Sequence, residues 1–185
     1  MTLPRGFKAN AERAAARLRA ELGLGAADRL PLHLLAEHLG ITLVSADDLV
    51  PLSQLEEIER LQALAFSAAT FVIGARRFVV TNPLRTPGRL ASDIAHEIAH
   101  VLLEHDLAEI REIEGVPFRT CQPDEEEQAT ALGGTLLLPR PLLMRGARGG
   151  DGAAEIADAY GVTVEMARFR YNTTGVAKQA QRRSG

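Results

Sequence analysis

Apolar residues recur at helical spacing along most of the chain, and glycine or proline interrupts that spacing repeatedly. The pattern predicts a mostly helical protein, with helices over 8–22, 31–39, 53–62, 93–104 and 124–138, then two short helices within 153–171. We expect Ser92 or Asp93 to cap the helix over 93–104, and Pro139 and Pro141 to end the helix over 124–138. Residues 146–152 should then form a glycine-rich linker.

Runs of β-branched and aromatic residues outside these helices predict strands at 41–44, 65–66, 71–73 and 77–81. The stretch 105–123 is polar and contains Pro117 and Pro123, so we expect it to be irregular. Together these elements predict the α+β class, with a small sheet of about three strands beside the helix over 93–104.

The composition is that of an ordinary globular domain, because 46% of the 185 residues are hydrophobic and 24% are charged. This length suits one hydrophobic core, and the sequence contains no internal repeat. We therefore expect a single domain over 1–185. Its core should cover about 30–171, with an N-terminal helix over 8–22 and a flexible tail from about 173.

Charge and composition exclude several classes of protein. The formal net charge is −3 and aromatic residues make up 4%, which disfavours a general nucleic-acid binder or a base-stacking surface. The lone Cys121 excludes an intrachain disulfide and a cysteine-rich zinc finger. The start of the sequence lacks the apolar region of a secretory signal, and no apolar run is long enough to span a membrane. We therefore expect a cytoplasmic protein.

The sequence His96-Glu97-Ile98-Ala99-His100 places an HExxH motif inside the helix over 93–104. Residues four apart on a helix lie on one face, about 6 Å apart at Cβ, so two imidazoles at this spacing can hold one metal ion. Glu97 lies beside the pair and can reach a water on that metal without being a ligand. The alternative is that these side chains form a solvated polar face.

A catalytic zinc site needs a third protein ligand, and acids of the later helix supply candidates. Glu126 shares a face with small residues, including Gly133, that would let its helix approach the HExxH helix closely. We therefore favour Glu126 as the ligand and keep Glu125 and Glu127 as alternatives. His105 follows His100 at an unusual spacing, so we interpret it as a surface residue.

Two segments resemble the ImmA/IrrE family of bacterial metallo-endopeptidases, which are HExxH zincins. They are RLASDIAHEIAHVLLEH at 89–105 and EEQATALGGTLLLP at 126–139. In that family the ligand glutamate lies thirteen residues before the closing proline, which corresponds to Glu126. The family usually has Asn or Asp where this chain has Thr130, so the resemblance implies a weaker partner for a ligand histidine.

The resemblance implies a zincin-like fold and a Zn²⁺ ion on His96, His100 and Glu126, with Glu97 as the general base of peptide hydrolysis. It also implies a narrow protein substrate, such as a helix-turn-helix repressor cleaved during stress or mobile-element induction. The alternative function is a regulatory protein-binding module with the same fold and little or no proteolysis. Candidate oxyanion donors, which the sequence does not rank, are Tyr160, Tyr171, His105 and Arg89.

Two further segments resemble parts of this family. FVVTNPL at 78–84 resembles the strand that in zincins pairs with extended substrate at the sheet edge. IADAYGVTVEMARFRYN at 156–172 resembles the closing helical pair, and it also has the pattern of a helix-turn-helix. Its surroundings carry little positive charge, so we do not expect it to bind DNA.

Overall fold

A computed structural model describes residues 3–63, 66–105, 110–113, 116–119, 122–176 and 179. Helices account for most of the described chain. Their bounds are α1 (Phe7–Glu21), α2 (Leu32–His38), η1 (Ala46–Asp48), α3 (Leu52–Leu61), α4 (Pro87–Leu102), α5 (Pro123–Leu137), α6 (Arg140–Gly149), α7 (Ala153–Tyr160) and α8 (Val164–Thr174). The strands are β1 (Ile41–Ser45), β2 (Ala68–Ile73), β3 (Arg76–Thr81), β4 (Ile110–Ile113) and β5 (Val116–Arg119). The predicted α+β, mostly helical class is confirmed.

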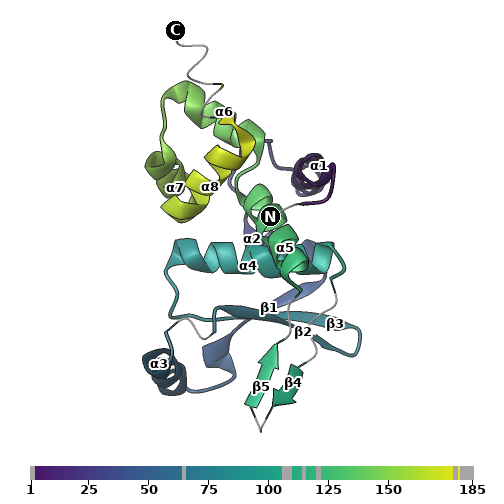
Figure 1. Ribbon diagram of the computed structural model, residues 1–185, viewed down its shortest axis with the longest axis vertical. Helices are drawn as coiled ribbons and strands as arrows, with labels where there is room; N and C mark the ends of the chain where they lie inside the picture. The colour runs from purple at the N-terminus through teal and green to yellow at the C-terminus, as the bar shows by residue number, and fades with distance from the viewer. Residues whose placement is uncertain are drawn as a thin grey trace.

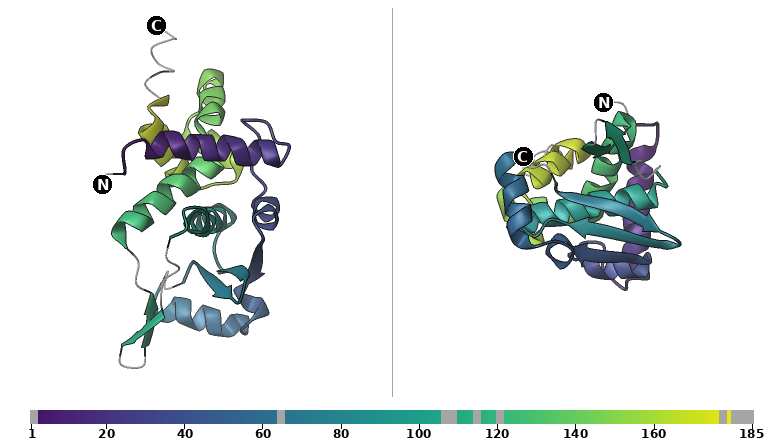
Figure 2. Two further views of the ribbon diagram at one scale, coloured as in Figure 1. Left: turned by 90° about the vertical axis from the view of Figure 1, so that its right-hand side faces the viewer. Right: turned by 90° about the horizontal axis from the view of Figure 1, so that it is seen from below.

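Helix α4 lies at the centre of the molecule (Figure 1). The sheet of β1, β2 and β3 packs on one side of it, while α1 and the C-terminal helices α6, α7 and α8 lie on the other side of α4 and α5. Figure 2 shows α5 running obliquely between α4 and α1. A helix in this position is covered from both sides, so its polar side chains can be enclosed rather than solvated.

The sheet has the strand order β1-β3-β2, with β1 parallel to β3 and β2 antiparallel to it. Gly74 forms the β2–β3 turn with φ of 63°, a left-handed conformation that glycine adopts without strain. The expectation that residues from 78 onward form an edge strand is wrong, because β3 is hydrogen-bonded on both sides. The edge strand nearer the HExxH residues is β2.

Helix α4 begins earlier than the sequence pattern indicated. Its N-cap is Thr86, and Pro87 occupies the first turn, where a missing N–H costs nothing. Gly88 permits this start, because a Cβ there would lie 2.8 Å from the carbonyl carbon of Val162. The predicted cap at Ser92 or Asp93 is therefore wrong, since a tertiary contact sets the start of the helix.

Two other elements differ from expectation. Helix α6 covers most of the predicted linker, because Pro141 lies in a first turn that tolerates proline and Gly150 ends the helix in the left-handed conformation. The antiparallel strand pair β4–β5 lies within the stretch expected to be irregular.

Cys121 and most of the expected tail lie outside the described residues. Among the described residues, no helix is long and apolar enough to cross a membrane.

Candidate metal centre

The histidines of the HExxH motif lie one turn apart on α4 and direct the same ring atom toward one point. The Nε2 atoms of His96 and His100 are 3.0 Å apart, and the two rings meet edge to face. This arrangement follows from the helical period, which stacks side chains four residues apart on one face.

Helix α5 carries Glu126 to the same point. Its carboxylate oxygens lie 3.1 Å from His96 Nε2 and 3.4 Å from His100 Nε2. Gly133 makes this approach possible, because a Cβ there would lie 2.9 Å from the carbonyl oxygen of Ala95 on α4. The small residues of α5 thus let two helix backbones meet, and this contact brings the carboxylate to the imidazoles.

The site is partly enclosed: the side chains of His96 and Glu126 are 26% and 36% exposed, whereas two of its residues are buried. His100 is 3% exposed and Glu97 is 4% exposed, so they do not form a solvated polar face. The hydroxyl of Thr70, on β2, donates a hydrogen bond to Glu97 Oε2 at 2.6 Å. Sequence reasoning missed Thr70, because only the packing of the sheet against α4 brings these two residues together.

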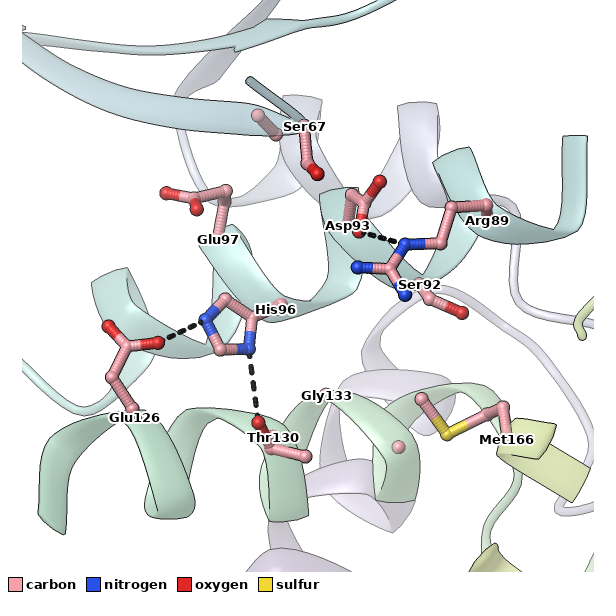
Figure 3. Close-up of a pocket in the computed structure, with 12 residues that line it drawn as sticks. Ser67, Arg89, Ser92, Asp93, His96, Glu97, Glu126, Thr130, Gly133 and Met166 are labelled. Atoms are coloured by element: carbon pink, nitrogen blue, oxygen red, sulfur yellow. Dashed lines mark hydrogen bonds and ion pairs between the residues drawn. The ribbon is translucent and has the colours of Figure 1, made fainter. Parts of the chain in front are cut away.

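Each histidine also has a neighbour at its outer ring nitrogen. His105 Nδ1 lies 3.0 Å from His100 Nδ1, which corrects the expectation that His105 is merely a surface residue. Thr130 Oγ1 lies 3.5 Å from His96 Nδ1, at the place the family resemblance implied. Figure 3 shows His96 between Glu126 and Thr130.

A cavity of about 390 Å³ lies beside these groups, between the edge of the sheet, α4, α5 and the first turn of α8. Arg89 lies in its wall, where its Nε is 2.9 Å from Asp93 Oδ1. Burial raises the pKa of the Asp93 carboxyl, although the nearby arginines oppose the effect. The lining residues are Ser67, Ala68, Arg89, Ser92, Asp93, His96, Glu97, Glu126, Thr130, Gly133, Gly134 and Met166.

The four candidate oxyanion donors differ in their position relative to the cavity. Tyr160 donates to the carbonyl of Ala27, and Tyr171 donates to the carbonyl of Asp151, so both hydroxyls are used in packing away from the cavity. His105 lies behind His100. Of the four candidates, only Arg89 lines the cavity.

The donor set fits a divalent metal ion. One ligand atom from each of His96, His100 and Glu126 can be chosen so that all three lie within 4.8 Å of one another. Two imidazole nitrogens and one carboxylate oxygen are a common set for catalytic zinc, which keeps a fourth position for water. Glu125 and Glu127 do not take part in this cluster.

An HExxH helix facing a glutamate helix beside a small mixed sheet defines a metallopeptidase-like domain. The Peptidase_M78 family, described as the IrrE N-terminal-like domain, matches residues 36–172. The chain therefore belongs to the ImmA/IrrE family.

A similar solved structure is that of a Mycobacterium tuberculosis transcriptional regulator, with a TM-score of 0.55 and 20% sequence identity. The match covers 87% of this chain and 46% of the regulator, so this chain corresponds to less than half of that protein. At this identity the likeness concerns the fold alone. No curated protein matches the chain.

Proposed function

We propose that this protein is a zinc-dependent endopeptidase. The convergence of His96, His100 and Glu126 beside a buried Glu97 carries this proposal. A protein that only bound a partner would not need a metal-ligand triad and a carboxylate enclosed next to it. Membership of a peptidase family supports a protein substrate.

The three ligand side chains would hold the ion between α4 and α5. A zinc ion in this position supplies a Lewis acid that polarises the scissile carbonyl and lowers the pKa of water. The residues around it supply the rest of the chemistry. Helices α4 and α5 pack directly against each other, and the three side chains already converge on one point, so little rearrangement is needed for binding.

Glu97 is the proposed general base. It takes a proton from the attacking water and passes it to the leaving amine, a role that suits a carboxylate held within reach of the reacting atoms. The hydrogen bond from the Thr70 hydroxyl to Oε2 orients this carboxylate. Arg89, in the cavity wall, is the candidate for contact with the substrate backbone or the developing oxyanion.

The proposed substrate is a regulatory protein, such as a helix-turn-helix repressor. The structural similarity to a protein named as a transcriptional regulator is compatible with a regulatory role. The alternative is a protein-binding module that contacts such a regulator without cleaving it. The ligand cluster and the enclosed Glu97 favour the peptidase.

The test incubates the zinc-loaded protein with a candidate helix-turn-helix regulator, for example one found to be encoded beside this protein's gene. Wild type should cleave it, and Glu97→Gln should retain stoichiometric zinc while cleavage falls by about 10²–10⁴-fold. Glu126→Gln should lose zinc, whereas the neighbouring Glu125→Gln should behave as wild type. If wild type binds the regulator tightly but leaves it whole, the binding-module alternative is correct.

A further inference from the structure

The end of α4 has an unusual backbone. Glu104 has φ of 54°, and among the described residues it is the only one besides glycine with a positive φ. The N–H of Glu104 donates to the carbonyl of Val101, and the N–H of His105 donates to the carbonyl of His100. These two bonds form a Schellman motif, in which glycine is the usual left-handed residue. Here a glutamate carries the strain.

The consequence of this turn is a contact between two imidazoles. In a Schellman motif the residue after the left-handed position folds back onto the last turn, where an apolar contact is common. In this chain those two positions are His105 and His100. Their Nδ1 atoms are 3.0 Å apart and their rings cross at 70°, which is hydrogen-bond geometry rather than stacking.

The direction of this hydrogen bond follows from the other side of the His100 ring. Its Nε2 faces His96 and Glu126, so Nε2 is the atom that would bind a metal through its lone pair. With a metal on Nε2, the proton of neutral His100 would reside on Nδ1 and be donated to His105 Nδ1. His105 accepts and carries its own proton on Nε2.

We propose that His105 is a positioning residue that selects the metal-binding tautomer of His100 and orients its ring, and that the left-handed Glu104 places it there. The partner of a ligand histidine is ordinarily a carboxylate, a backbone carbonyl or water. Here the partner of His100 is a second histidine, His105, which lies outside the HExxH motif. The proposal rests on the metal site of the proposed function, but it concerns metal binding and not cleavage.

The test measures zinc affinity by competition with a chelator, in the full chain. Leucine and asparagine have nearly the same shape, but only asparagine keeps an acceptor close to the position of Nδ1. His105→Leu should weaken zinc binding by about 10–100-fold, and His105→Asn should remain within about threefold of wild type. Equal affinity for wild type and His105→Leu, or equal weakening in both variants, would overturn the proposal.

Two further measurements do not depend on how these variants fold. In ¹⁵N-edited spectra of the zinc-loaded wild type, His100 Nδ1 should carry a proton and His105 Nδ1 should not. The reverse assignment would overturn the proposal. Glu104→Gly should leave zinc affinity unchanged, because glycine adopts the same turn, whereas Glu104→Val should weaken it by displacing His105.

If the zinc affinities of the variants differ as predicted but the protein cleaves no regulator, the proposed function is wrong and this inference stands. If the protein cleaves a regulator but His105→Leu and His105→Asn bind zinc equally well, this inference is wrong and the proposed function stands.

Discussion

The two histidines of the motif lie on consecutive turns of the same helix, yet their surroundings differ. The side chain of His100 is 4% exposed and His105 lies 3.0 Å from its outer nitrogen. The side chain of His96 is 26% exposed, and its outer neighbour, the Thr130 hydroxyl, is 3.5 Å away. One imidazole is therefore enclosed and closely supported, whereas the other borders the cavity with a looser partner.

This difference indicates different roles for the two histidines within the proposed metal site. A buried, hydrogen-bonded imidazole keeps its orientation without the metal, because the packing around it allows few rotamers. An imidazole at a cavity wall can adjust when substrate enters. The difference in exposure and partners arises from the elements that pack around each histidine, because the HExxH motif alone does not distinguish the two residues.

The largest effect is expected from a change that separates α5 from α4, because both histidines depend on this helix contact to meet Glu126. Gly133→Ala would place a Cβ against the backbone of Ala95, which cannot move aside easily, so α5 and Glu126 should shift away from α4. Zinc affinity should fall at least about tenfold, and the free energy of unfolding should fall by about 1–3 kcal/mol. Chelator competition and urea unfolding measure the two effects.

Gly134→Ala is the matched control, because it has the same gain in helix propensity but meets side-chain atoms of Arg170 and Met166, at 3.1 Å, and no backbone atom of α4. If the two alanine variants bind zinc equally well and are equally stable, the close approach at Gly133 does not hold the site together.

The second prediction separates the two histidines directly. His96→Ala and His100→Ala should both abolish zinc binding. In metal-free protein, however, His100→Ala should lower the free energy of unfolding by about 1–3 kcal/mol more, because it leaves a cavity and removes the partner of His105. Denaturant unfolding of chelator-treated protein measures this. Equal stabilities would show that the enclosure of His100 contributes nothing before metal binds.

The third prediction concerns the looser support of His96. Thr130→Val should weaken zinc binding only by a few-fold, less than the effect of His105→Leu, because the hydroxyl is farther from its ring nitrogen. Thr130→Asp should tighten binding by up to about tenfold, since a carboxylate is a stronger acceptor. Gln128→Asp adds the same charge to the same helix and serves as its control. An equal gain in that control would point to net charge instead.

The smallest expected effect concerns Asp93, which lines the cavity and lies three residues before His96 on α4. Burial raises the pKa of Asp93, so the folded protein keeps that proton to a higher pH than the unfolded chain does. The stability this provides is present at low pH and is lost as the pH rises through the raised pKa. The stability of Asp93→Asn relative to wild type should therefore increase with pH and then level off.

The change for Asp93→Asn should be about 1 kcal/mol or less, measured by urea unfolding of the metal-free protein from about pH 4 to pH 7. A pH-independent difference between the two proteins would show that Asp93 has an ordinary pKa.

Sequence reasoning succeeded where one helix carries the information. The relative positions of His96, Glu97 and His100 follow from the helical period. The small residues that share a face with Glu126 predicted that this face of α5 approaches α4. It failed where a distant contact decides. The early start of α4 depends on Gly88 against Val162, and the central place of β3 depends on pairing with both neighbours.

The amino-acid sequence by itself determined the spacing of the motif, the helical class and the face of the second helix on which Glu126 lies. Backbone hydrogen bonds within each helix set these relations, so they hold wherever the helix lies. Only the tertiary structure decided that Thr70 holds Glu97 and that the fold-back at Glu104 places His105 behind His100. These contacts join separate elements or depend on a strained turn, and no local period encodes them.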